Sequence, residues 1–537
     1  MHMDHFTVDG KPFFSLGAQA HNASCYDLKD MEWAFRGAKA LGLNTIAVPV
    51  YWEQIEPEEG VFDFSVVSAL ILRCRKEGLK LSVLWFGTWK NGKMSFVPRW
   101  VKADTARFRR VLTHDGYPVS VLSSYCRETL EADKRAFSRL VGFIRKIDQR
   151  HKTVLAIQVE NEPGIVGSFR DYDPEGVRHF ESAVPEAVIQ AVKDTPISPT
   201  YRIWQQHGAK ESGAWPEVFG ERAGEYAACY SIAQFVDEVT QAGKAVYDEV
   251  PYYINADLDL GHKWPVGGVE YFGAGPHTHG LPFYKAGMPH IDLICPDIYE
   301  QDWPTYQFEV DVYKDERFPL YIPESSSGGP NAKYLFYAIQ EGTIGFHVFG
   351  LESMFDETGA LRPGAREMAD SFHMLRAIQP LLLQYRGTGR VHAIMQQEHC
   401  AEQHIELEGG AMARIAFYSA LGEGETVYSD YIHRGRRYPQ EGRGLLIQVS
   451  EKEFYLVGDA FTLHLAKPFQ EDGRTNLQFS YARLQDRGAS YMLVDEGHFD
   501  EAGNFVVDRR RNGDERDYSI WATADVGVIH IEMSDWI

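Results

Sequence analysis

At 537 residues the chain is longer than one ordinary domain. We expect two or three domains, each large enough for its own core. Lys and Arg number 54 against 76 Asp and Glu, a net charge of −22, which argues against a nucleic acid or an anionic membrane as partner. A neutral ligand fits this charge better.

The chain has no apolar run near the roughly 20 residues that a membrane span needs. Its start, MHMDHFTVDGKPFF, lacks the basic segment and apolar core of a secretory signal, so we expect a cytoplasmic protein. The cysteines are scattered without C-x-x-C spacing, which predicts buried free thiols: Cys25, Cys74, Cys126, Cys229, Cys295 and Cys400. We expect no metal and no cofactor.

Short apolar runs, most of them rich in β-branched or aromatic residues, recur through the first two thirds of the chain. They lie at 13–19, 44–50, 80–86, 153–159, 251–256, 291–297, 318–323 and 343–349. Such runs are typical of parallel strands that are buried on both faces.

Segments with helical periodicity separate these runs, for example 28–43, 131–149 and 223–249. Strand and helix alternate eight times, which predicts an α/β fold, a (β/α)8 TIM barrel, over residues 1–380. A doubly wound open sheet is the structural alternative. The eight cycles and the absence of a G-x-G-x-x-G turn after the first strand weigh against it.

Past about residue 380 the hydrophobic period changes from helical to alternating, as in 442–467, 489–508 and 517–533. Turn residues separate these runs at strand-like spacing, which predicts an all-β sandwich over residues 381–537. The boundary is expected near 379–390. The sandwich is expected to stabilise the barrel or to form oligomers, and we expect a homo-oligomer.

Two strand ends of the predicted barrel carry glutamates. The fourth strand ends in Asn161-Glu162, and the seventh, FPLYIPESSSGG, ends in Glu324. The active site of such a barrel lies at the carboxyl ends of its strands, and strands four and seven face each other across the mouth. Paired carboxyls about 5 to 9 Å apart hydrolyse glycosides, one protonating the leaving oxygen while the other stays ionised. For a lone Glu, a salt bridge is the alternative.

These glutamates, one preceded by Asn, resemble the pattern of glycoside hydrolase clan A. The stretch VPVYWEQIEPEEGVFDF (48–64) is similar to the second-strand signature of family 42 and family 35 β-galactosidases. The segments 84–102, INADL (254–258), CPDIY (295–299) and GRGLLIQVSEKEFYLVGDAF are similar to a bacterial β-galactosidase-like group that joins this barrel to a β-sandwich. The resemblance covers nearly the whole chain.

The resemblance implies that Glu162 is the acid/base and Glu324 the nucleophile. It also implies that Asn161 hydrogen-bonds the sugar 2-hydroxyl, where contacts strengthen as the ring approaches an oxocarbenium ion. Tyr299, which ends CPDIY, would hydrogen-bond Glu324 and keep it ionised. A tyrosine that only packs is the alternative.

Further polar residues are expected near the barrel mouth. The first strand ends in GAQAHNAS, which places His21 and Asn22 there, and Gln19 stands where the related group often has an acidic residue. That departure bears on sugar selection. Lys90 and Asn91 are candidates for contacts to sugar hydroxyls, although a solvated turn explains them equally well.

Four tryptophans follow predicted strand ends: Trp52, Trp85, Trp89 and Trp303. Flat rings suit the apolar face of a pyranose, and they also suit ordinary packing. We treat all four as candidate substrate contacts.

Other chemistries fit less well. His277 and His279 in PHTHG have no third ligand at metal spacing, so a loop histidine pair is favoured over a zinc site. A Schiff-base aldolase needs a desolvated lysine inside a strand, and no predicted strand interior has one.

The sequence therefore predicts a retaining exo-β-glycosidase that acts on a neutral oligosaccharide or glycoside, with β-galactosidase as the preferred activity. A clan A enzyme of other specificity, such as a β-glucosidase, is the alternative enzyme. A non-catalytic sugar-binding barrel is the alternative outside enzymes, although such a protein would be expected to lose one carboxylate.

Overall fold

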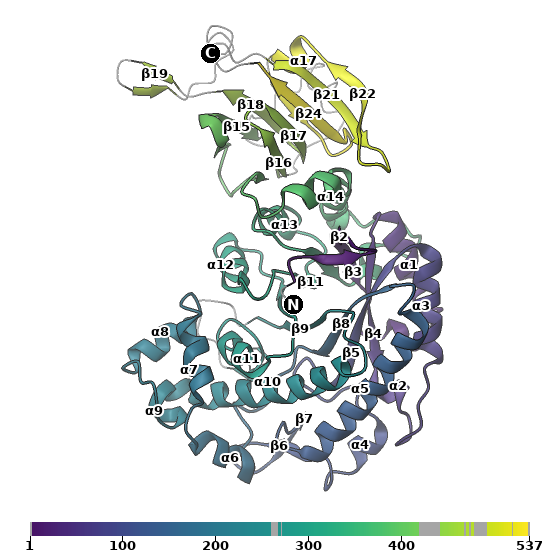
Figure 1. Cartoon of the computed structure of the whole chain (residues 1–537), viewed down its shortest axis with the longest axis vertical. Helices are drawn as coiled ribbons and strands as arrows, with labels where there is room; N and C mark the ends of the chain where they lie inside the picture. The colour runs from purple at the N-terminus through teal and green to yellow at the C-terminus, as the bar shows by residue number, and fades with distance from the viewer. Residues whose placement is uncertain are drawn as a thin grey trace. The chain divides into compact units, whose positions relative to one another are not determined.

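The computed structural model describes residues 3–258, 267–269, 271–417, 441–466, 469–471, 474–476, 491–517 and 519–534. The chain divides into two compact units (Figure 1). The first holds residues 1–326 and 344–359, and the second holds residues 327–343 and 360–537. Among the described residues, no helix combines the length and the apolar character that a membrane crossing requires.

Eight parallel strands form the central sheet of the first unit. They are β3 (Ser15–Gln19), β4 (Thr45–Tyr51), β5 (Lys80–Lys90), β8 (Val154–Asn161), β9 (Tyr252–Ala256), β10 (Leu293–Ile298), β11 (Glu324–Ser325) and β12 (Gly345–Phe349). From β3 to β11 each strand pairs with the next of this series, and β12 pairs with β3. A parallel bridge between Ile322 and Phe346 closes the ring, with a 2.9 Å hydrogen bond from His347 N to Ile322 O. The predicted barrel is confirmed.

The apolar composition of these strands follows from their position. Every residue of β4 and β8 is buried, because side chains fill the barrel on one face and helices cover the other. Two strands differ from their predicted bounds by more than two residues at one end. The third, β5, continues to Lys90, and the seventh begins only at Glu324, after the single bridge at Ile322.

Helices of the first unit separate the strands. The longer ones are α1 (Glu32–Ala40), α3 (Ser65–Glu77), α5 (Arg127–Asp148), α10 (Ala223–Lys244) and α12 (Trp303–Tyr313). Figure 1 shows α3 and α5 flanking the strands of the barrel. In α5 the apolar residues Phe137, Leu140 and Ile144 recur at helical spacing and are fully buried, with the Phe137 ring centroid 5.9 Å from that of Trp85 in β5.

Shorter elements complete the first unit. Four helices are inserted between β8 and β9: α6 (Pro174–Glu181), α7 (Glu186–Lys193), α8 (Pro199–Gln206) and α9 (Trp215–Phe219). The others are β1 (Phe6–Val8), β2 (Lys11–Phe13), η1 (Ser24–Tyr26), α2 (Trp52–Ile55), α4 (Arg99–Ala103), β6 (Arg110–Leu112), β7 (Pro118–Leu122), η2 (Gly220–Arg222), α11 (Leu281–Gly287) and η3 (Leu351–Met354).

Two large antiparallel sheets form most of the described part of the second unit. The six-stranded sheet has the order β13 (Val391–Met395), β16 (Arg443–Ser450), β17 (Glu453–Asp459), β24 (Val528–Met533), β21 (Tyr491–Phe499) and β22 (Phe505–Arg511). The four-stranded sheet has the order β14 (Glu402–Glu406), β15 (Met412–Phe417), β18 (Phe461–Ala466) and β23 (Ile520–Ala522). Both sheets supply one core, which includes Leu456, Phe461 and Ile531. The predicted antiparallel β domain is confirmed.

Several smaller elements accompany these sheets: η4 (Pro363–Ala365), η5 (Glu408–Gly410), β19 (Phe469–Glu471), β20 (Arg474–Asn476) and α17 (Asp514–Asp517). Two longer helices, α13 (Asn331–Gln340) and α14 (Arg366–Tyr385), belong to the second unit. Lys333 of α13 donates to the carbonyl of Gln396 at 2.8 Å, and Arg443 donates to Ser371 of α14 at 3.1 Å. The predicted boundary at residues 380 and 381 stays a prediction.

Candidate active site

The two glutamates predicted at strand ends lie together. Glu162 directly follows β8, and Glu324 begins β11, where it pairs in register with Asp297 of β10. One carboxyl oxygen from each of Glu162, Asp297 and Glu324 lies within 4.8 Å of the other two. Glu162 and Glu324 are only 5% and 3% exposed, so two carboxyls share one poorly solvated space.

The backbone bends sharply around Asn161. Glu160 and Glu162 have φ angles of 63° and 42°, left-handed conformations that cost non-glycine residues about 1–3 kcal/mol each. Surrounding hydrogen bonds hold the bend, because Asn255 Oδ1 accepts from Glu162 N at 3.0 Å and Gly92 N donates to Glu162 O at 3.0 Å. The alternation of a regular strand is lost here, and the side chains of consecutive residues reach one site.

Glu324 is surrounded by hydrogen-bond donors. Tyr299 OH donates to its Oε2 at 2.8 Å. Asn161 Nδ2 and Asn255 Nδ2 each lie 3.3 Å from its Oε1. Three donors aimed at one carboxyl stabilise a negative charge on it. The structure thus brings both Asn161 and Tyr299 to Glu324. The contact of Asn161 with a sugar 2-hydroxyl stays a prediction.

Glu162 has different surroundings. Burial raises its pKa to about 8, the Lys90 ammonium opposes that rise, and the charges of Glu324 and Asp257 add to it. Lys90 Nζ lies 3.5 Å from Glu162 Oε2, and Asn91 Nδ2 donates to the same oxygen. Near neutral pH this carboxyl is therefore largely protonated and can donate its proton.

Asp297 is a third carboxyl that the sequence did not identify as part of the site. It is 2% exposed, and Asn255 Nδ2 donates to its Oδ2 at 2.7 Å. Burial and the charges of Glu324 and Glu162 raise its pKa well above the usual range. Asn255 and Asp297 are the next-to-last residues of the fifth and sixth strands, in the motifs INADL and CPDIY. Their position near strand ends is the sequence feature that could have identified them.

Lys90 and Asn91 also reach the site. Lys90 is the last residue of β5 and donates to Asn161 Oδ1 at 2.7 Å, which orients the Asn161 amide. Asn91 has a φ of 52° and lies in the turn that follows. The solvated turn considered as an alternative does not describe Lys90, which is 5% exposed.

The tryptophans are placed differently. Trp52 and Trp85 are fully buried with ring centroids 6.4 Å apart, and Trp85 Nε1 donates to Asp133 at 2.9 Å. This packing favours a structural role for both rings. Trp89 is fully buried against Phe235, and Trp303 begins α12 half-buried. Substrate contact by these four rings stays a prediction.

Gln19, His21 and Asn22, at the end of the first strand and just after it, have no hydrogen bond to Glu162 or Glu324 among the described residues. His21 N donates to Glu352 Oε2 at 3.1 Å, and His21 Nε2 lies 2.6 Å from Ser353 Oγ. Gln19 is fully buried, and neither of its amide atoms has a hydrogen-bond partner among the described residues. The Oδ1 atom of Asn22 is likewise without a partner there. A sugar hydroxyl would satisfy the free Asn22 atom, and His21 and Asn22 stay candidate substrate contacts.

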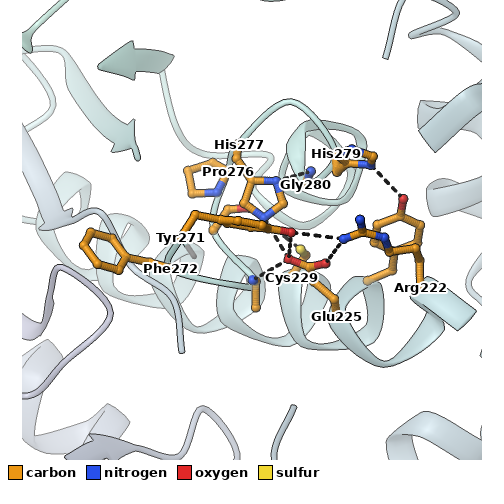
Figure 2. Close-up of polar contacts among 12 residues, drawn as sticks. Arg222, Glu225, Cys229, Tyr271, Phe272, Pro276, His277, His279 and Gly280 are labelled. Carbon is orange, nitrogen blue, oxygen red and sulfur yellow. Dashed lines mark hydrogen bonds and ion pairs between the residues drawn. The ribbon is translucent and has the colours of Figure 1, made fainter. Parts of the chain in front are cut away.

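The histidine pair of PHTHG is part of a buried network (Figure 2). His277 Nε2 lies 3.2 Å from Glu225 Oε1, and His279 Nδ1 lies 3.1 Å from Tyr226 OH. Two groups of three potential ligands occur among the described residues, namely Glu162, Asp297 and Glu324, and Glu453, His530 and Glu532. Neither includes these histidines.

Comparison with known proteins shows similarity to glycoside hydrolases over part of the chain. Residues 5–214, less than half of the chain, match the model of glycosyl hydrolases family 35. Residues 368–523 match a domain of unknown function, DUF5597.

Individual proteins show the same similarity at low identity. The chain is 29% identical over 178 residues to human beta-galactosidase-1-like protein 3, covering 32% of this chain and 25% of that protein. It is 29% identical over 174 residues to a beta-galactosidase of Xanthomonas manihotis, covering 26% of this chain and 29% of that protein. A beta-galactosidase structure from Bacillus circulans sp. alkalophilus has a TM-score of 0.49 and 14% identity, covering 72% of this chain and 58% of that one. The chain thus matches only about a quarter of the length of these curated relatives.

Proposed function

We propose that the protein is a retaining exo-β-glycosidase, with β-galactosidase as the preferred activity, that releases terminal non-reducing β-galactosyl groups from neutral glycosides. The observation that carries this proposal is the contrast between two neighbouring carboxyls. Glu162 has a pKa raised to about 8 by burial, whereas Glu324 accepts hydrogen bonds from Tyr299, Asn161 and Asn255. One is suited to give a proton and the other to attack.

In the first displacement, a carboxylate oxygen of Glu324 bonds to the anomeric carbon. The bond from that carbon to the leaving oxygen breaks, and the leaving oxygen takes the proton of Glu162. In the second, the Glu162 carboxylate accepts a proton from water, whose oxygen bonds to the anomeric carbon as the ester to Glu324 breaks. Both glutamates return to their starting states.

The short distance between the carboxyls supports retention. Oxygens of Glu162 and Glu324 lie within 4.8 Å of each other. Retaining enzymes have carboxyls about 5–5.5 Å apart, whereas inverting enzymes need about 6.5–9.5 Å to hold a water between carboxylate and sugar. The proposed nucleophile therefore contacts the sugar directly.

In this proposal Asn161 hydrogen-bonds the sugar 2-hydroxyl. Its amide is already held by Lys90 on one side and by Glu324 on the other, so it requires little reorganisation. His21, Asn22 and the tryptophans are further candidate contacts. Cytoplasmic location and homo-oligomer formation stay predictions.

A panel of nitrophenyl glycosides tests the proposal. Turnover of the β-galactoside far above the β-glucoside, the β-mannoside and the α-galactoside is expected, and Glu324→Gln is the matched inactive control. Preference for the β-glucoside would favour the alternative enzyme, because galactose and glucose differ only at the 4-hydroxyl. Absence of any turnover, with binding of galactose retained, would favour a sugar-binding barrel.

A further inference from the structure

A second cavity lies apart from the glutamate pair, among elements that follow β8 and β9. Its volume is about 880 Å³, within the range typical of ligand sites. Its walls include Phe169, Arg170, Tyr172, Phe180, Phe219 and Arg222. Glu162, Asp297 and Glu324 do not line it.

Arg170 is held in this cavity by aromatic rings. Its guanidinium carbon lies 4.0 Å from the ring centroid of Tyr172 and 4.1 Å from that of Phe180. Gly224 of α10 borders the same side chain, and a Cβ at Gly224 would lie 3.3 Å from Arg170 Cδ. The rings fix the guanidinium plane and leave the N–H groups at its edge to bond elsewhere.

Within the part of the chain that the structure describes, no carboxylate pairs with Arg170. Its one hydrogen bond as a side-chain donor there is a 3.4 Å contact from an Nη1 to the carbonyl of Asp171. A planar guanidinium with unused parallel donors suits a carboxylate or a sulfate, which can accept two hydrogen bonds at once.

The charges of Arg222 and Glu225 in the cavity wall are already paired with each other (Figure 2). Arg222 NH1 donates to Glu225 Oε2 at 3.0 Å, and Tyr271 OH donates to Glu225 Oε1 at 2.7 Å. Burial would raise the pKa of Glu225, but hydrogen bonds and charges from His277, Tyr271 and Arg222 lower it to about 2. This network rigidifies the wall around Arg222 and leaves Arg170 as the group that attracts an anion.

Aromatic surface adjoins Arg170. Phe169 precedes it in the chain and is 49% exposed, although it is a large apolar residue. Phe219, at the end of α9, also lines the cavity. Flat apolar rings beside a charged hydrogen-bond donor fit a pyranose that carries an acidic group.

We propose that this cavity is a binding site for an anionic saccharide, with Arg170 pairing its carboxylate or sulfate and Phe169 packing against its ring. That the ligand is a saccharide rests on the proposed function, whereas the anion site rests on Arg170 alone. The loop that starts at Glu162 continues to Arg170, eight residues on, at most about 29 Å of extended chain. In a substrate with a neutral terminal sugar and an acidic sugar in its leaving group, the terminal sugar would bind at the glutamate pair and the acidic sugar in this cavity.

Direct binding tests the proposal without requiring turnover. Titration calorimetry of the full chain with galacturonate, galactose 6-sulfate, galactose and inorganic phosphate compares two acidic sugars with a neutral sugar and a free anion. We expect galacturonate or galactose 6-sulfate to bind at least about tenfold more tightly than galactose, and more weakly as salt rises.

The variants are Arg170→Gln, Arg170→Lys, Phe169→Ala and the control Arg127→Gln. Arg127 is 61% exposed on α5, pairs with Glu131 and Glu238, and does not line the cavity. Arg127→Gln therefore removes the same charge as Arg170→Gln, but at a site outside the cavity. Arg170→Gln should weaken binding of the acidic sugar by about tenfold or more, and Arg127→Gln should leave that affinity unchanged. Arg170→Lys should retain part of the affinity, which keeps the test valid if Arg170→Gln does not fold.

Three results would overturn the proposal: acidic sugars that bind no better than galactose, binding that survives loss of Arg170, and phosphate that binds as tightly as the sugars. A protein that binds galacturonate through Arg170 but hydrolyses no glycoside would contradict only the proposed function. Normal hydrolysis of a nitrophenyl galactoside by a protein that does not bind acidic sugars would contradict only this inference.

Discussion

The hydroxyl of Tyr299 donates a 2.8 Å hydrogen bond to Glu324 Oε2. Tyr299 follows β10 and Glu324 begins β11, so the contact joins two neighbouring strands at the barrel mouth. Tyr299 is 37% exposed, but desolvation around its hydroxyl and the nearby charges of Glu324 and Asp297 raise the pKa of Tyr299, so its hydroxyl keeps its proton and remains a donor. A donor of this kind stabilises the charged form of the proposed nucleophile and orients it.

Tyr299→Phe should lower kcat for a nitrophenyl galactoside by about 10- to 100-fold, because a hydrogen bond to a charged group contributes about 1.5–3 kcal/mol. KM should change little, because the lost hydrogen bond acts on the attacking carboxylate and not on the bound sugar. Steady-state kinetics measures both constants. A loss confined to KM would indicate that the hydroxyl contributes to sugar binding and not to the attack.

The pH dependence of Glu162 provides a second prediction. The raised pKa, about 8, means that Glu162 is protonated at neutral pH and loses its proton as the pH rises through that region. The basic limb of kcat/KM should therefore fall near pH 8. Glu162→Gln should remove or greatly weaken this limb for substrates with good leaving groups, which need no acid. An unchanged bell-shaped profile in this variant would place the acid on another residue.

The two glutamates should differ in how azide rescues their variants. Glu324→Gly should reduce turnover by at least about a thousandfold, and azide should then attack the vacated face to give the α-glycosyl azide. Glu162→Ala should instead give the β-azide, because there azide replaces water in the second displacement. NMR of the products distinguishes the two anomers. Inverted wild-type product in early spectra would make Glu324 a base for water.

Asp297 should act as a neutral hydrogen-bond donor. Asp297 Oδ1 has no hydrogen-bond partner among the described residues, and one Asp297 oxygen lies within 4.8 Å of a Glu162 oxygen. A proton on Asp297 that is shared with Glu162 would lower the pKa of Glu162, opposing the effect of burial. Asp297→Asn retains a donor, so we expect kcat/KM within about tenfold of wild type and an unchanged basic limb. Asp297→Leu removes the donor and should move the basic limb to higher pH. If the Asn variant is as impaired as the Leu variant, the site needs the charge of Asp297.

The core of the second unit should respond to a single truncation. Leu456 in β17 is fully buried between the two sheets, and Leu456→Ala should lower the free energy of unfolding of this unit by about 2–5 kcal/mol. Met492 in β21 is 64% exposed, so Met492→Ala is the matched control with little expected effect. Denaturant unfolding measures the difference. Equal effects of the two substitutions would contradict the assignment of this core.

The sequence by itself determined the barrel and the two glutamates. A parallel strand covered on both faces must be apolar throughout, so β4 and β8 were recognisable without knowledge of their neighbours. The abrupt change from an apolar run to Asn161-Glu162 indicates a strand end that carries reactive side chains. Period-two patterning likewise predicted the β domain, although not the four-residue helix α17 within it.

The tertiary structure alone decided which side chains meet. Asn255 and Asp297 are far apart in the chain and contact each other only because β9 and β10 are neighbours in the closed ring. Packing also decides that the rings of Trp52 and Trp85 are buried in the interior. Their sequence position near strand ends does not specify the direction in which a ring points. The surroundings of Glu162 and Glu324, which separate their roles, are likewise a product of burial and of partners from other strands.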